Sequence, residues 1–145
     1  NPGSLPGNVQ IIGTDISNTM LAHCQAGSYD SLALSRGLSL ARKQQFFETD
    51  NNGMLTVKNV IKKMVSFRQL NLLNSYNSLG RFDLIFCRNV LIYFNPELKS
   101  QVISQIHSRL NNGGYLFLGA SESLSGISQK FSILRCDPGI IYQKK

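Results

Sequence analysis

Short apolar runs and one long amphipathic segment divide the chain into candidate strands and helices. The apolar run at residues 9–14 predicts a strand, and Asp15 follows it directly. Ser17 is a residue type that caps helices and Gly27 is one that ends them, so we expect a helix between the two. The apolar face of this helix would consist of Met20, Leu21 and Cys24. A strand, an acidic residue and a helix in this order are typical of half a parallel α/β unit.

The middle of the chain has a less regular pattern. Residues 38–47 predict a helix, and the Asn-Asn-Gly sequence at 51–53 predicts a turn before a strand at 54–57. Lysines are mixed with apolar residues at 60–67, which fits either a helical turn or a strand. We expect residues 44–67, approximately, to form a small inserted antiparallel β subdomain.

The second half returns to regular patterns. Residues 70–73 are expected to close a strand, and residues 82–87 form a nearly continuous apolar run, which is typical of a strand buried on both faces. Further strands are predicted at 115–118, 131–135 and 140–142. The last two would form an antiparallel hairpin, because the Asp-Pro-Gly sequence at 137–139 has the residue types of a tight turn.

The strongest helix signal begins at Asn95. Asn95 is a capping residue, Pro96 suits the first helical position and Glu97 favours the first turn. The Asn-Gly-Gly sequence at 112–114 follows the last turn. The apolar stripe of this helix consists of Leu98, Val102, Ile106 and Leu110.

Composition limits the class of protein. The chain has 145 residues, of which 42% are apolar and 16% charged, so it should fold as one domain or most of one. No apolar stretch approaches the roughly 20 residues of a membrane-spanning helix, and no signal segment opens the sequence. We expect a soluble, cytoplasmic protein without membrane insertion. The three cysteines are far apart and the two histidines fall in separate helical patterns, so we expect no disulfide framework and no metal site.

Positive charge is unevenly distributed. The net charge is +7, and seven basic but only two acidic residues lie at 36–68. Such a segment either keeps the protein soluble or attracts an acidic partner, which could be a nucleic acid or a glutamate-rich protein.

Polar residues follow two of the predicted strands. Asp15 lies where open α/β sheets place a carboxylate against the hydroxyls of a nucleotide ribose, although it could equally cap the next helix. The strand at 82–87 delivers Arg88 and Asn89 to the carboxyl edge of the sheet, where polar groups usually face a ligand crevice.

Ordered motifs through the chain resemble one known family. They are Gly-Thr-Asp-Ile-Ser at 13–17, Val-Ser-Phe at 65–67 leading to Asn-Leu-Leu at 71–73, Phe-Asp-Leu-Ile-Phe-Cys-Arg-Asn-Val-Leu-Ile-Tyr-Phe at 82–94, and Gly-Ala-Ser-Glu-Ser at 119–123. In order and spacing they resemble the CheR-type chemotaxis receptor methyltransferases, which transfer a methyl group from S-adenosyl-L-methionine to receptor glutamates. The Cys-Arg-Asn-Val-x-Ile-Tyr-Phe string is the specific part, and the resemblance spans essentially the whole chain.

The resemblance implies a fold, a cofactor and a partner. The fold would be α/β, with a Rossmann-like methyltransferase sheet, the product would be S-adenosyl-L-homocysteine, and the partner would be the cytoplasmic region of a chemotaxis receptor. Arg88 and Tyr93 would be catalytic, with Tyr93 near the reactive methyl group. The cofactor-binding residues would be Asp15 for the ribose, Asn71 and Leu72 for the adenine, and Arg88 with Asn89 for the methionine end.

The chain also departs from the family pattern. The glycine-rich motif between the first strand and the first helix of this fold is absent, because no Gly-x-Gly occurs among the twelve glycines. The helical N-terminal domain of the family is missing too. We therefore expect residues 1–145 to be the C-terminal portion of a methyltransferase catalytic domain, incomplete at the N-terminal side of its sheet. Such a fragment should be inactive alone and should self-associate.

Two features of the sequence each allow two interpretations. The 44–67 segment lies where the family carries an inserted antiparallel subdomain that some members use to dock a receptor tail by strand addition, but strand packing alone would explain it. Glu122 follows a predicted strand and would either contact substrate or cap a turn.

Two other functions compete with receptor methylation. A nucleic-acid methyltransferase would commonly carry an Asn-Pro-Pro-[Phe/Tyr] tetrad where this chain has Cys-Arg-Asn-Val at 87–90, and an arginine suits an anionic substrate better, so we expect no nucleic-acid partner. A non-catalytic adaptor would bind partners through the basic segment. The retained candidate site residues argue against an adaptor, whereas the missing glycine motif argues for an inactive chain.

Overall fold

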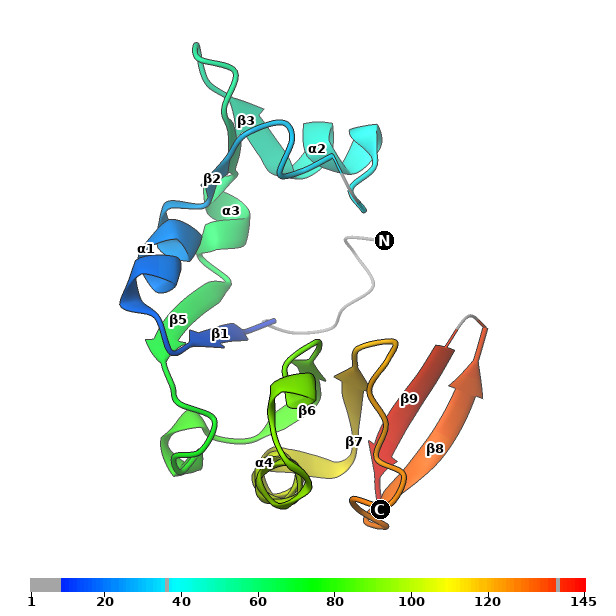
Figure 1. The fold of residues 1–145 in the computed structure, drawn as a ribbon. Coiled ribbons are helices and arrows are strands. Elements are labelled where there is room, and N and C mark those ends of the chain that lie inside the picture. The colour runs from blue at the N-terminus through cyan, green and yellow to red at the C-terminus, as the bar shows by residue number, and fades with distance from the viewer. Residues whose placement is uncertain (1–8, 36, 138) are drawn as a thin grey trace. The chain divides into compact units, whose positions relative to one another are not determined.

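The computed structural model describes residues 9–35, 37–137 and 139–145. It divides into two compact units, Asn1–Asn71 and Leu72–Lys145, which are described separately below (Figure 1). Residues 1–8 lie outside the described residues, as does the proline at the centre of the expected 137–139 turn.

A parallel strand pair forms the base of the first unit. Strand β1 (Ile11–Asp15) pairs with β5 (Val65–Gln69), with Ile11 opposite Val65 and Asp15 opposite Gln69. Helix α1 (Asn18–Ala26) follows β1, and both of its predicted ends are confirmed. The Ser17 hydroxyl accepts from the backbone N–H of the first turn, and Gly27 ends the helix with a positive φ of 60°.

A three-stranded antiparallel sheet forms the rest of the first unit. Its strands are β2 (Ser28–Tyr29), β3 (Phe47–Thr49) and β4 (Leu55–Val57), in the order β2-β4-β3. Helix α2 (Leu40–Phe46) leads directly into β3. The predicted turn between β3 and β4 is organised by Asp50, whose Oδ1 accepts from the N–H groups of Asn52 and Met54 at 2.8 and 2.9 Å.

The antiparallel sheet does not have the expected 44–67 bounds. It begins earlier, because Gly27 turns the chain straight from α1 into β2 and accepts a bond from the Val57 N–H at 2.8 Å. It also ends earlier, because the segment of uncertain pattern at 60–67 is divided between two elements. Helix α3 (Asn59–Lys62) takes its first part, and β5 takes its second part into the parallel pair.

Two lysines of the basic segment hold elements of the first unit together. The Lys58 ammonium donates to the carbonyls of Gln44 and Gln45 at 3.2 and 2.9 Å, at the end of α2. The Lys62 ammonium donates to the carbonyl of Ala26 at 2.5 Å, at the end of α1. Cations at helix C-termini also interact favourably with the helix dipole. Part of the positive charge in this segment therefore has a structural role.

The second unit is a mixed four-stranded sheet covered by one long helix (Figure 1). Its strand order is β6-β7-β9-β8, with β6 and β7 parallel and the other pairs antiparallel. The antiparallel hairpin of β8 and β9 confirms the prediction for the end of the chain. The strands are β6 (Phe82–Cys87), β7 (Leu110–Leu118), β8 (Phe131–Cys136) and β9 (Gly139–Lys144).

Helix α4 (Pro96–Arg109) supplies much of the core of this unit. Its start is as predicted, because Asn95 Oδ1 accepts from the Leu98 N–H at 2.9 Å and Pro96 takes the first helical position. Val102, Ile103 and Ile106 are buried on its inner face, and Leu116 of β7 is fully buried. The ring of His107 packs edge-on against Phe131 of β8, at 5.3 Å between ring centroids.

Two expectations for the strands of this region are wrong. Strand β6 is buried on one face only: Cys87 is buried, whereas Phe86 is 64% exposed and stacks on Phe117 of β7. Helix α4 covers one side of the sheet, so only alternate residues of β6 reach the core.

Residues 70–73 are not a strand, because β5 ends at Gln69 and the chain then turns toward the short 3₁₀ helix η1 (Asn77–Leu79). The Tyr76 hydroxyl donates to the Leu72 carbonyl at 2.7 Å in that turn.

None of the helices in the described ranges is long and apolar enough to cross a membrane.

Candidate active site

The loop after β6 carries three of the predicted site residues. We call residues 88–93 the 88–93 loop; its last part is the 3₁₀ helix η2 (Leu91–Tyr93). Arg88, Asn89 and Tyr93 are exposed, and Tyr93 is 81% exposed. The Arg88 guanidinium makes no hydrogen bond or ion pair with any described residue. Leu91, at 2% exposure, anchors the loop in the core while the polar side chains around it face outward.

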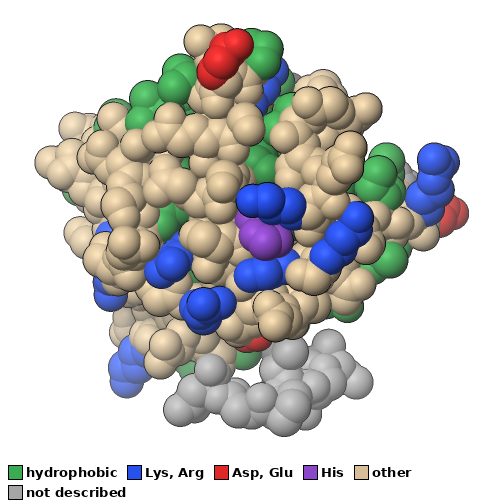
Figure 2. Space-filling view, turned by 90° about the horizontal axis from the view of Figure 1, so that it is seen from below, with side chains coloured by type: hydrophobic (Ala, Val, Ile, Leu, Met, Phe, Trp, Pro, Cys, Tyr) green, Lys and Arg blue, Asp and Glu red, His purple; other side chains and the backbone are tan. Residues whose placement is uncertain are grey.

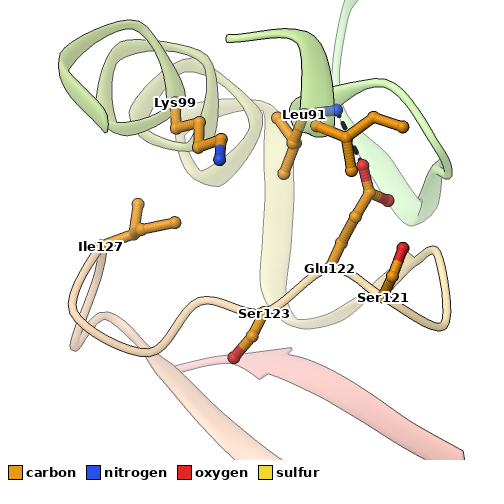
Figure 3. A pocket seen from close by; sticks show the side chains of 7 residues that line it. Leu91, Lys99, Ser121, Glu122, Ser123 and Ile127 are labelled. Carbon is orange, nitrogen blue, oxygen red and sulfur yellow. Dashed lines mark hydrogen bonds between the residues drawn. The ribbon is translucent and has the colours of Figure 1, made fainter. Parts of the chain in front are cut away.

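Glu122 holds this loop from the end of the neighbouring strand. Its Oε1 accepts from the backbone N–H groups of Val90 and Leu91 at 2.9 and 2.8 Å. Its Oε2 accepts from the N–H groups of Asn89 and Gly119, both at 2.7 Å. Figure 3 shows the side chain rising from the segment after β7 toward the backbone of Leu91. One carboxylate therefore ties the loop after β6 to the end of β7.

The backbone around Glu122 is shaped for this contact. Asn89 has a φ of 58°, and no other non-glycine residue among those described has a positive φ. This left-handed conformation is uncommon outside glycine, and asparagine is among the residues that tolerate it best. A Cβ atom at Gly119 would collide with Asn89 and would come within 2.7 Å of Glu122 Oε2. Glycine at 119 therefore allows the loop and the carboxylate to approach the strand end.

Two opposed effects set the charge state of Glu122. Burial alone would raise the pKa of this carboxyl group, but bonds from the N–H groups of Gly119, Asn89, Leu91 and Val90 stabilise the carboxylate and hold the pKa below its ordinary value. Burial, reinforced by the nearby Glu122 charge, raises the pKa of the Cys87 thiol to about 11. Glu122 is thus ionised and Cys87 is a neutral thiol at neutral pH.

A small pocket of about 70 Å³ adjoins Glu122. Lys99 enters it from α4, and Ser121 and Ser123 lie on either side of Glu122 (Figure 3). The other residues lining the pocket are Leu91, Ile92 and Ile127. Its size suits a solvent molecule better than a cofactor, so the surface of the 88–93 loop is the better candidate for ligand contact.

The remaining predicted site residues lie at the ends of β1 and β5. Asp15 is exposed, its Oδ1 accepts from the Ser17 N–H at 2.8 Å, and its carbonyl accepts from the Leu70 N–H at 2.9 Å. Its Oδ2 accepts no hydrogen bond from the described residues. Asn71, two residues after β5, is partly exposed, and Leu72 begins the second unit. The structure thus brings Asp15 beside the segment that leads to Asn71, and it brings Arg88, Asn89 and Tyr93 together in one loop.

The sequence did not reveal the role of Glu122. Its contacts with the N–H groups of residues 89–91 span more than thirty positions, so no local pattern predicts them. The available signal was an acidic residue just after a predicted strand, following Gly119. Of the two roles left open above, the structure shows the capping role, because Glu122 accepts hydrogen bonds from four backbone N–H groups.

Basic side chains gather around a histidine on one face of the surface (Figure 2). In the second unit, burial together with the positive charges of Lys144 and Lys130 lowers the pKa of His107. The Lys144 ammonium donates to the Leu110 carbonyl at 2.9 Å, so it also supports the packing of the sheet.

Comparison with solved structures defines the class of fold. The magnesium protoporphyrin IX methyltransferase of Synechocystis PCC 6803, solved with bound SAM, matches with a TM-score of 0.53 and 18% identity, over 92% of this chain and 57% of that one. An rRNA methylase from Streptococcus thermophilus matches with a TM-score of 0.50 and 12% identity, over 93% and 73% of the two chains. The fold is therefore the Rossmann-like fold of SAM-dependent methyltransferases.

Sequence comparison identifies the family within that class. The CheR methyltransferase SAM-binding domain matches residues 2–140, and the chain belongs to this family. A chemotaxis protein methyltransferase of Vibrio parahaemolyticus is 58% identical over 144 residues, which are 99% of this chain and 52% of that protein. The chemotaxis protein methyltransferase Cher2 of Pseudomonas putida is 52% identical over 145 residues, 100% of this chain and 53% of that protein. The chain spans about half the length of these curated relatives.

Proposed function

We propose that the whole protein containing this chain transfers the methyl group of S-adenosyl-L-methionine to glutamate side chains of chemotaxis receptors. The observation that carries the proposal is the family match over residues 2–140, joined to relatives of 52–58% identity that are named chemotaxis protein methyltransferases. Residues 1–145 would be the C-terminal portion of its catalytic domain, and it would act in the cytoplasm.

The described residues fit a cofactor of this kind. Asp15 has a carboxylate oxygen available for a ribose hydroxyl, because only its Oδ1 is engaged in capping. Asn71 and Leu72 would line the adenine, and Arg88 with Asn89 would lie at the methionine end. The exposed Arg88 guanidinium suits a carboxylate, since it can form two parallel hydrogen bonds to one. When bound, the cofactor would supply an electrophilic methyl group on a positively charged sulfur.

The chemistry requires placement more than proton transfer. A glutamate carboxylate has a reference pKa of about 4.3, so the receptor substrate is already ionised at neutral pH and needs no general base. The protein would contribute by holding the two reactants in line. Tyr93 would present its exposed ring to the sulfonium cation, an interaction of roughly 0.5–2 kcal/mol.

The antiparallel sheet supports an interaction with the receptor. We propose that the β2-β4-β3 sheet is the inserted subdomain, with β2 and β3 at its two edges. An exposed edge strand can accept an extended peptide as an additional strand. The positive charge of the surrounding segment would favour an acidic receptor surface.

The test is a methylation assay on the whole protein with receptor cytoplasmic fragments and labelled cofactor. Methyl esters of glutamate release methanol on mild base treatment, so we expect base-labile label on the receptor. Base-stable label on RNA or DNA would contradict the proposal and would favour a nucleic-acid methyltransferase.

A further inference from the structure

We infer that Glu122 is a positioning residue for methyl transfer: its carboxylate fixes the 88–93 loop in the conformation that presents Arg88 and Tyr93 to the reactants. The inference rests on the proposed function. Glu122 itself would touch neither cofactor nor receptor, because both of its oxygens are already engaged by backbone N–H groups.

The number and direction of its hydrogen bonds give Glu122 this role. Three consecutive N–H groups, from Asn89 to Leu91, converge on one carboxylate, and a fourth comes from Gly119. Hydrogen bonds to a charged acceptor are stronger than hydrogen bonds between neutral groups. An anion at this position is therefore the principal organiser of the loop backbone.

The bonds to Glu122 also set the geometry of the predicted catalytic residues. With their N–H groups held by Glu122, the carbonyls of Val90 and Leu91 accept from the N–H groups of Tyr93 and Phe94 at 3.2 and 3.0 Å. These bonds form the 3₁₀ turn that ends at Tyr93. The direction of the Tyr93 side chain therefore depends on a chain of contacts that begins at Glu122.

The backbone conformation of Asn89 is also linked to Glu122. The positive φ of Asn89 lies one residue after Arg88, and asparagine tolerates this conformation without requiring it, so neighbouring contacts help to select it. Glu122 Oε2 accepts directly from the Asn89 N–H. Without that contact, ordinary negative φ values would be more accessible to Asn89, and the direction of the backbone that carries Arg88 would be less firmly fixed.

The experiment compares two charge-neutralising variants of the whole protein. E122Q keeps the size of the side chain, but its amide nitrogen would face two N–H donors and cannot accept from them. The matched control is D83N at the opposite end of β6, where the side chain accepts from Asn111 Nδ2 at 2.8 Å and an asparagine oxygen can still do so. For each variant, kcat, KM for the receptor fragment and affinity for S-adenosyl-L-homocysteine are measured.

We expect E122Q to lower kcat at least tenfold and to weaken product affinity, while KM for the receptor stays within twofold. D83N should change all three values less than twofold. A merely structural role would lower the amount of folded enzyme and leave kcat per folded molecule unchanged. A folded E122Q enzyme with wild-type kcat would overturn the inference.

A second variant keeps the test decisive if E122Q folds poorly. E122D retains the negative charge on a side chain one methylene shorter, so fewer of the four bonds can form together. We expect E122D to lie between wild type and E122Q, with kcat reduced at least threefold, and wild-type kcat in E122D would also overturn the inference. A wild-type protein that does not methylate receptors would instead contradict the proposed function, which separates the two failures.

Discussion

In the proposed site, the Asp15 carboxylate would use one oxygen for structure and the other for the ligand. Oδ1 accepts from the Ser17 N–H at the start of α1, and Oδ2 is available for a ribose hydroxyl. Asp15→Ala in the whole protein should therefore weaken S-adenosyl-L-methionine binding by about 1–3 kcal/mol, the range for losing a hydrogen bond to a charged group. Isothermal calorimetry measures the change.

Ser17→Ala is the control for that prediction. It removes the side-chain cap of α1, with an expected cost of about 1 kcal/mol in stability, but leaves Asp15 in place. Cofactor affinity should be unchanged in this variant. Equal affinities of wild type and Asp15→Ala would contradict the ribose assignment.

Arg88 offers a test of chemistry without a large effect on folding. Because Arg88 is exposed and has no partner among the described residues, Arg88→Ala should remove most receptor methylation while the free energy of unfolding stays within about 0.5 kcal/mol of wild type. Base-released methanol and urea denaturation provide the two measurements. Arg81→Ala, at the other end of β6, is the matched control, and a similar loss of activity there would refute a specific role for Arg88.

The charge of Glu122 predicts a pH-dependent contribution to stability. The pKa of its folded form is lowered because four N–H bonds outweigh the effect of burial. A group with a lowered folded pKa stabilises the protein above its unfolded pKa, and that contribution is lost as pH falls through the folded value. The difference in unfolding free energy between wild type and E122Q should therefore shrink as the pH falls from the ordinary glutamate value of 4.5 through the lower folded value. A difference independent of pH in urea titrations would rule out the charged form as the stabilising species.

At the scale of elements, local signals predicted those parts of the fold that local chemistry determines. Helix α1 starts and ends where Ser17 and Gly27 predicted, and α4 starts at the predicted Asn95 cap. Strand β6 has the predicted bounds, because its apolar run is continuous. In each case the residues that determine the element lie within a few positions of one another in the sequence, so a local sequence pattern is enough to predict it.

Elements that depend on distant partners were less predictable. Strand β2 has only two residues, and it is a strand because β4 lies beside it. The exposure of Phe86 depends on which side of the sheet α4 covers, which the apolar run at 82–87 does not encode. For the candidate site, the residues after β1 and β6 followed from the rule that ligands meet the carboxyl ends of parallel strands, whereas Glu122 required the folded contact.

The cap of α4 gives an element-scale prediction. Asn95 Oδ1 accepts from the Leu98 N–H at 2.9 Å, so Asn95→Ala should destabilise the protein by about 1 kcal/mol. Asn95→Asp should restore most of that loss, because aspartate caps equally well and its charge is favourable at a helix N-terminus. Urea denaturation of both variants checks the prediction, and equal destabilisation by the two would contradict it.

At the scale of the whole molecule, strand edges determine how the 145-residue chain should behave alone. Among the described residues β1 pairs with β5 alone and β6 pairs with β7 alone, so each strand has an edge without a neighbour. Unpaired edges of apolar strands promote pairing between molecules. We expect the isolated chain to self-associate in light scattering and to show no measurable methyl transfer. A monomeric chain with robust turnover would contradict this prediction.

The lysine contacts of the first unit have a consequence for chemical labelling. Lys62 and Lys63 are adjacent, yet Lys63 is exposed whereas the Lys62 amine is held by the Ala26 carbonyl. An amine-reactive acylating reagent should therefore modify Lys63 well before Lys62, with a difference that peptide mass spectrometry can quantify. Acylation of Lys62 would require the link between α3 and the end of α1 to open. The extent of its modification would thus measure how often these two helices separate in solution.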